Sequence, residues 1–296
     1  MTTLTRRHAL ALATGALAVS ALPAGAARAA APAIRVGEIG LSFHQVAAAV
    51  VLEVLERLGH DTALSAAAHD EMFRRLAAGE VDMLAVAWLP GAHGHLFKAN
   101  TEAVERLGTL YSDAKLYWAV PDYVPASAVA SIADLTKPDV AAKMDKLIRS
   151  IGPSAGLSVR SGRAMELYGL PAAGYRLETG DAAGWIANYR AAAAEKRWMV
   201  MPLWRPQFLN ATERFRVLDD PKEAFPPADE AVLVVSKTAL AALPPRTVAA
   251  LRRLDIGLDG ISAMDKAVNV DKRTPREAAR AWMAENAAKV NGWLAS

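Results

Sequence analysis

The chain contains no cysteine among its 296 residues. This absence excludes disulfide bonds, thiolate metal sites, a cysteine nucleophile and a lipid anchor on an N-terminal cysteine. A large excess of one charge is also missing, because 34 lysines and arginines face 31 aspartates and glutamates. With 53% hydrophobic residues the chain can bury a sizeable core, and its length predicts two lobes or one large α/β domain.

Histidine is absent after His95. The segment Gly152-Pro153-Ser154-Ala155-Gly156 matches the G-x-S-x-G motif of serine hydrolases, but no histidine follows it and no convincing strand precedes it. His93 and His95 are spaced like a metal-binding pair, yet no third ligand has suitable spacing, so we interpret them as a solvated loop pair. The sequence therefore predicts no catalytic residues, no metal site and no cofactor.

Long apolar runs are scarce, and the N-terminal run from Ala9 to Leu22 has only 14 residues. A membrane-spanning helix needs about 18 or more. The run follows Arg6-Arg7 and precedes a small-x-small site at Ala27-Arg28-Ala29, which is typical of a secretory signal peptide over residues 1–29. The paired arginines resemble a twin-arginine signal, although Ala9 replaces the large apolar residue usual there.

Cleavage after Ala29 removes three arginines and no acidic residue, which leaves 31 basic residues against 31 acidic ones. A mature chain without net charge has no electrostatic reason to bind nucleic acid or an anionic membrane. The sequence thus predicts a soluble protein of a Gram-negative-type periplasm, not anchored to the membrane after cleavage.

Strand and helix patterns alternate along the mature chain. Ser42 and Gln45 predict a capping box at the start of a helix whose apolar residues run from Val46 to Leu58. Strands are expected on both sides of it and after the next helix, at 34–37, 61–64 and 81–87. This alternation predicts a doubly wound α/β sheet.

A second α/β region is expected after a strand at 116–120. Pro121 and Pro125 bracket a stiff segment that we interpret as a crossing between lobes, and strand 231–235 is expected to return the chain. Between them we expect a helix at 140–148 and a strand at 198–203. Three C-terminal helices follow, and the last begins at a capping box over 274–277. The predicted lobes are residues 30–121 with 232–296, and residues 122–231.

Two tryptophans end predicted strands, one in each lobe. Trp88 follows strand 81–87 and Trp204 follows strand 198–203. Ligands in such folds bind outside the carboxyl ends of the strands, so these rings could face each other and hold a quaternary ammonium group by cation–π attraction. The alternative is that both rings only pack core. Further ring candidates are Tyr111, Tyr117, Trp118 and Trp185.

The loop before Ser42 leads into a helix N-terminus, whose free amides suit a ligand carboxylate. A capped helix with nothing bound is the alternative interpretation of the same residues.

Several segments together resemble one known family: Leu55–His60, Gly79–Asp82, Trp88-Leu89-Pro90 with His93, Val120–Val124, Ser131–Leu135, Tyr168–Leu170, Trp204-Arg205-Pro206 and Leu218–Pro221. In their order and spacing the chain resembles the substrate-binding proteins of osmoprotectant ABC importers, the glycine betaine, proline betaine and choline binders. The resemblance implies a type II-like, two-lobed periplasmic-binding-protein fold with a doubly wound α/β sheet in each lobe and two hinge crossings. It also implies an aromatic cage and delivery to a membrane permease with a separate ATPase subunit.

Two departures from the family pattern concern the ligand. The family often has a tryptophan before the first helix, where this chain has Leu41 and Phe43, and the family's Trp-x-Pro-His ends here in Gln207. By resemblance Trp88 and Trp204 are cage residues, a third ring comes from Phe43, Tyr117 or Trp185, and Ser42, His93 and Gln207 complete the expected site.

We therefore predict a monomeric solute-binding component of an ABC importer that takes a betaine- or choline-like ligand and performs no covalent chemistry. An importer component for another polar solute, such as an amino acid, would instead place salt-bridging groups in the crevice, for example Arg160 or Arg205 with Asp70. A periplasmic hydrolase would need a catalytic constellation that the spacing does not provide.

Overall fold

The computed structural model describes residues 32–295, so the predicted signal peptide and its cleavage site lie outside the described residues. Within them, no helix combines the length and the apolar character needed to span a membrane.

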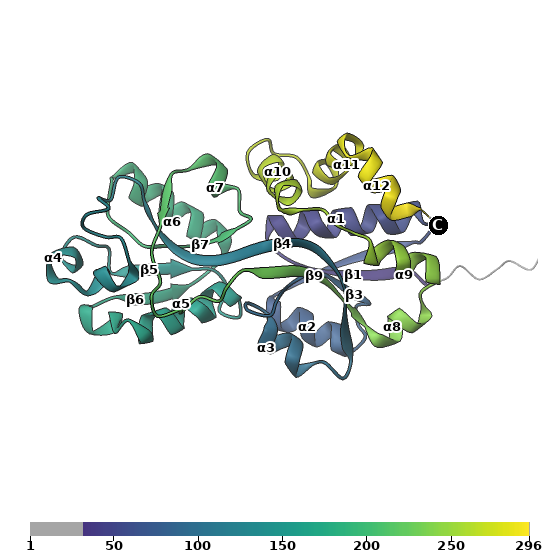
Figure 1. Cartoon of the computed structure of the whole chain (residues 1–296), viewed down its shortest axis with the longest axis horizontal. Helices are drawn as coiled ribbons and strands as arrows, with labels where there is room; N and C mark the ends of the chain where they lie inside the picture. Colours follow the sequence, from purple (N-terminus) through teal and green to yellow (C-terminus); the bar gives the residue numbers. More distant parts are fainter. Residues whose placement is uncertain (1–31, 296) are drawn as a thin grey trace, which may run out of the picture. The chain divides into compact units, whose positions relative to one another are not determined.

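A mixed sheet forms the centre of the fold (Figure 1). Its parallel part follows from the alternating pattern: α1 (Ser42–Arg57) and α2 (His69–Ala77) connect three strands that lie side by side. Their spatial order is β2 (Thr62–Ala67), β1 (Ile34–Ile39) and β3 (Met83–Leu89). Every residue of β3 is buried, as expected for a central strand covered on both faces. The prediction of an α/β sheet in this half is confirmed.

The rest of this sheet is antiparallel. β9 (Asp229–Ser236) pairs with β3 on one side and with β4 (Val104–Pro121) on the other. β4 continues beyond this partner and pairs with β7 (Met201–Arg205) and β8 (Phe215–Val217). One long strand therefore belongs to both halves of the fold.

The change of partner along β4 lies upstream of the expected crossing at Pro121–Pro125. β4 pairs with β9 as far as Ala114 and with β7 from Lys115 onward. The register shifts between Tyr111 and Ala114, and Asp113 between them has a φ of 65°. Such an irregularity bends a strand, so β4 can change partners without a loop. The division into lobes at residues 121/122 and 231/232 stays a prediction.

The second half is smaller than the first. β5 (Leu147–Ser150) and β6 (Arg176–Thr179) form a parallel pair. α5 (Gly156–Leu167) follows β5 in the chain, and α6 (Ala182–Ala194) follows β6. The other short helical segments of this half are η1 (Ile132–Thr136), α4 (Pro138–Ala141), η2 (Leu170–Ala173) and α7 (Leu209–Thr212).

The prediction of a helix over residues 140–148 is wrong. α4 ends at Ala141, and the apolar residues that follow belong to β5 or lead into it. The Asp145 amide donates to the Trp198 carbonyl and Met144 forms a bridge with Trp198, so pairing with a distant segment replaces the local helix.

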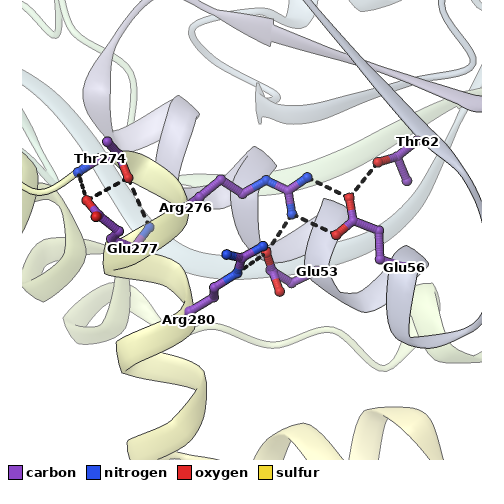
Figure 2. Close-up of polar contacts among 7 residues, drawn as sticks. All are labelled: Glu53, Glu56, Thr62, Thr274, Arg276, Glu277 and Arg280. Atoms are coloured by element: carbon purple, nitrogen blue, oxygen red, sulfur yellow. Dashed lines mark hydrogen bonds and ion pairs between the residues drawn. The ribbon is translucent and has the colours of Figure 1, made fainter.

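Five helices follow β9 where three were expected: α8 (Lys237–Ala242), α9 (Pro245–Arg252), α10 (Leu258–Asn269), α11 (Pro275–Glu285) and α12 (Ala287–Leu294). α10 and α11 pack on α1. Figure 2 shows the contact: Arg276 binds Glu53 and Glu56 of α1, and Arg280 also binds Glu53. The predicted capping box of Thr274 and Glu277 is confirmed. α3 (Gly94–Ala99) lies between β3 and β4 in the chain.

Candidate ligand-binding site

One pocket lies where the ends of several strands meet the starts of the following helices. The empty space in it, including space open to solvent, is about 280 Å³. The first half of the fold and the second half both line it: Leu41, Phe43, His44, His69, Trp88, Ala92, His93, Leu116, Ile151, Ala155, Gly156, Leu157 and Trp204. None of these described lining residues is acidic, and most are apolar.

Three aromatic rings gather on this pocket. Phe43 lies between the two tryptophans, with its ring centroid 5.3 Å from Trp88 and 5.9 Å from Trp204. The Trp88 indole donates through Nε1 to the buried Tyr111 hydroxyl at 2.9 Å, which fixes its ring. Each tryptophan is followed by one residue and a proline in a cis peptide bond. We call Phe43, Trp88 and Trp204 the ring cluster.

Trp185 supports this cluster from behind. Its ring stacks on Trp204 with the centroids 4.8 Å apart and the planes at 27°, and its Nε1 donates to the Pro202 carbonyl. Trp185 is not among the lining residues of the pocket. The Trp204 Nε1 is buried and has no hydrogen-bond partner among the described residues. Buried donors normally have a partner, and an acceptor on a ligand would supply one here.

Three histidines from separate elements also meet at the pocket. The ring centroids of His44, His69 and His93 are 5.2 to 6.3 Å apart. Burial lowers the pKa of His69 to about 4 and holds the pKa values of His44 and His93 well below the usual range. All three imidazoles are therefore neutral at neutral pH. We call them the histidine cluster.

The tautomer of His93 follows from its backbone contact. The Trp88 amide donates to His93 Nδ1 at 2.9 Å, so the neutral ring carries its proton on Nε2. A protonated Nε2 donates hydrogen bonds and does not bind a metal. Among the described residues, no group of three or more histidines and carboxylates has the arrangement of a metal site. The interpretation of His93 as solvated is wrong, because its side chain is buried while His95 is exposed.

The N-terminus of α5 forms the opposite wall. Ala155 occupies the cap position and offers no side-chain hydrogen bond, so the amides of the first turn lack a protein side-chain cap. Gly156 lies against Ala92 so closely that a Cβ on it would be 2.6 Å from the Ala92 Cβ. The Gly152–Gly156 motif thus allows a close backbone approach at the pocket.

A model of the substrate-binding domain of ABC-type glycine betaine transport systems, called OpuAC, matches residues 32–285. The chain belongs to the OpuAC family. The glycine betaine/carnitine transport binding protein GbuC of Listeria monocytogenes is 27% identical over 157 residues, which is 53% of this chain and 52% of that protein. The matched part of the chain therefore spans about half the length of this curated relative.

Solved structures share the OpuAC fold. Lactococcal OpuAC, closed with glycine betaine, is 22% identical with a TM-score of 0.80, and the match covers 89% of this chain and all of that one. ProX from Borrelia burgdorferi is 20% identical with a TM-score of 0.81, covering 88% and 96%. A choline-binding protein in complex with choline is 19% identical with a TM-score of 0.80, covering 88% and 91%. These similarities confirm the two-lobed periplasmic-binding-protein fold.

Some of the residues expected to form the site line the pocket of this OpuAC member, and others do not. Trp88, Trp204, Phe43 and His93 line the pocket, and Trp185 lies behind Trp204. The Tyr117 hydroxyl donates to Asn210 Oδ1 and the ring lines two other hollows. The Gln207 side chain accepts from the Leu209 amide.

Ser42 does not cap α1 as the sequence predicts. The N-cap residue is Leu41, whose side chain makes no hydrogen bond to the first turn, so the predicted capping box of Ser42 and Gln45 is wrong. The Ser42 hydroxyl donates to the Asp265 carboxylate at 2.5 Å, and Gln45 donates to Glu38. A carboxylate of the protein thus already lies beside the start of α1.

Sequence reasoning missed His44, His69 and the wall formed by α5. A signal for the histidines was present: each follows the carboxyl end of one of three neighbouring parallel strands, His69 after β2, His44 after β1 and His93 after β3. The groups expected for an amino-acid site are elsewhere, because Arg160, Arg205 and Asp70 are not among the lining residues. Arg160 donates instead to the Gly91 carbonyl.

Proposed function

We propose that this OpuAC member captures a small zwitterionic quaternary amine of the glycine betaine type in the pocket described above. The observation that carries the proposal is a cluster of three aromatic rings on a pocket whose described lining contains no acidic side chain. A cation held without a carboxylate of the protein must be held by rings and must supply its own counter-charge.

The ring cluster suits the ammonium end of such a ligand. A quaternary ammonium has no N–H to donate, so contact with an aromatic face is the favourable interaction that it can make. Each such contact contributes roughly 0.5–2 kcal/mol, at the upper end where water is excluded. Phe43, Trp88 and Trp204 are each at most 4% exposed, so their faces are well desolvated.

Hydrogen-bond donors suit the carboxylate end. The first-turn amides of α5, the Nε1 of Trp204 and the Nε2 of His93 all belong to residues or segments that line the pocket. The positive end of the α5 dipole adds to their attraction for an anion. Choline lacks the carboxylate, so these donors would stay unpaired beside it and its charge would have no partner.

The protein would deliver its ligand to a membrane permease driven by a separate ATPase subunit. Family membership supports this role. The predicted signal peptide over residues 1–29 supports export to the periplasm. The protein would act there as a monomer and without chemistry of its own.

Calorimetric titration of residues 30–296 tests the proposal. Glycine betaine, carnitine, trimethylamine N-oxide and choline are compared with glutamate and arginine at one pH and ionic strength. We expect saturable binding of glycine betaine, binding of choline at least ten-fold weaker because its charge is unpaired, and no binding of the two amino acids. Binding of glutamate or arginine without any methylated amine would contradict the proposal.

A further inference from the structure

A buried carboxylate of the protein, that of Asp265, lies behind the pocket without lining it. Asp265, on α10, is fully buried, and no lysine or arginine pairs with it among the ion pairs of the described residues. Hydrogen bonds alone stabilise it. Ser42 Oγ donates to one oxygen at 2.5 Å, the Phe208 amide donates to the other at 2.6 Å, and Asn269 Nδ2 donates at 3.1 Å. We call Ser42, Phe208, Asp265 and Asn269 the Asp265 junction.

The junction connects both walls of the pocket. Ser42 begins α1 and directly precedes Phe43 and His44. Phe208 follows β7 and comes four residues after Trp204. One carboxylate therefore bonds to the first turn of the helix that carries one ring and to the turn that follows the other ring.

The same contact joins segments that the sequence assigns to different lobes. α10, which packs on α1, lies in the segment 232–296 predicted for the first lobe. Phe208 lies within the segment 122–231 predicted for the second. Figure 1 shows α10 facing α7, and Phe208 is the cap residue of α7.

The chemistry of the junction favours the joined arrangement. Burial of a carboxylate is costly unless hydrogen bonds replace its water, and bonds to an ionised group are roughly twice as strong as neutral ones. If the turn at Phe208 moved away from α10, Asp265 would lose one of its three donors, and the Phe208 amide would lose its acceptor. Burial raises the pKa of Asp265 to about 6, so the group is ionised at pH 7.5 and these bonds are charge-assisted.

We propose that Asp265 is a positioning residue that joins the two walls of the pocket and slows ligand release without touching the ligand. The proposal rests on the proposed function for the identity of the ligand, but the joining of the walls is a property of the ligand-free chain as well.

The first experiment measures glycine betaine binding and release by stopped-flow tryptophan fluorescence at pH 7.5. Asp265→Asn keeps the shape and removes the charge, and Asp259→Asn makes the same change at an exposed position of the same helix. We expect the release rate of Asp265→Asn to rise about ten-fold with an association rate within about two-fold of wild type. Asp259→Asn should match wild type.

Ser42→Ala is a milder second variant, because it removes one donor and leaves the charge. Its release rate should rise about two- to five-fold. It keeps the proposal testable if Asp265→Asn does not fold. Release rates equal to those of Asp259→Asn in folded Asp265→Asn, or in folded Ser42→Ala, would overturn the proposal.

The second experiment needs no ligand. Because the chain has no native cysteine, cysteines introduced at the exposed positions Asp139 (α4) and Lys237 (α8) accept two spin labels without competing sites. We expect Asp265→Asn to shift the distance distribution between the labels to longer values, and Asp259→Asn to leave it unchanged. An unchanged distribution in Asp265→Asn would overturn the proposal. If glycine betaine does not bind wild type, the proposed function fails, and this measurement alone decides the role of Asp265.

Discussion

Identical side chains in this protein have different roles because their neighbours differ. Trp204 lines the pocket, and its indole N–H has no partner within residues 32–295, whereas Trp185 behind it donates to a backbone carbonyl. Trp118 is buried and donates to the Ser161 hydroxyl. A ring must present a face to the pocket to contact a ligand, and an unused N–H adds a hydrogen bond. Both properties depend on neighbours distant in sequence.

Trp204→Ala should weaken glycine betaine binding by about 1–3 kcal/mol, because it removes one ring face and one donor. Calorimetry measures the change. Trp198→Ala is the matched control, since Trp198 lies beside Lys143 and outside the pocket. Unchanged affinity in folded Trp204→Ala would remove this ring from the site.

At the scale of elements, the ends of strands and the starts of helices form the site. The strand-end rule predicts Trp88 and Trp204 in the site, and both residues line the pocket. A strand followed by a turn places its next side chain at the sheet edge. Ser42 and Gln207 are predicted on other grounds, a helix start and a family motif. Their side chains bond to neighbouring protein groups. A polar residue at a helix start has several available partners, and packing decides among them.

The close approach of α5 to the loop after β3 can be tested at one position. Gly156→Ala places a Cβ 2.6 Å from the Ala92 Cβ, so the walls must move apart. Overpacking of this kind costs about 1–3 kcal/mol, and we expect glycine betaine affinity to fall by about ten-fold or more.

Gly162→Ala on the same helix is the control for this change, because its Cβ would meet no atom within 4 Å. It should keep wild-type affinity and slightly stabilise the helix. Equal affinities of the two alanine variants would contradict the close approach.

For the whole molecule, buried titratable groups link stability to pH in opposite directions. The folded-state pKa of His69 is about 4, below the usual 6.5, so the unfolded chain binds the proton first as the pH falls. Stability from His69 is present above pH 6.5 and is lost as the pH falls towards 4. Asp265 acts oppositely, because its pKa is raised to about 6 and the folded chain takes up its proton first.

His69→Gln isolates one of these contributions. Between pH 7 and pH 5 the free energy of unfolding of wild type should fall more than that of His69→Gln, by up to about 2 kcal/mol. Urea denaturation at the two pH values measures the difference. His95→Gln, at an exposed position, should keep the wild-type dependence. Parallel behaviour of wild type and His69→Gln would show that His69 titrates normally in the folded state.

Several features of the fold could be predicted from the sequence alone. The alternation of strands and helices predicted the parallel sheet, the Thr274 capping box began a helix, and the family segments predicted the binding-protein fold. These features depend on local periodicity, hydrogen bonds over three or four residues and short motifs, all of which are readable along the chain.

Only the tertiary structure decided which residues share the pocket. The pairing of Met144 with Trp198 replaced an expected helix, the bend at Asp113 moved the change of sheet partner into β4, and three distant histidines met beside Trp88. The burial of Asp265 between Ser42 and Phe208 joins residues more than 50 positions apart. Such contacts depend on packing and desolvation between remote segments, and neither can be predicted from the local sequence pattern.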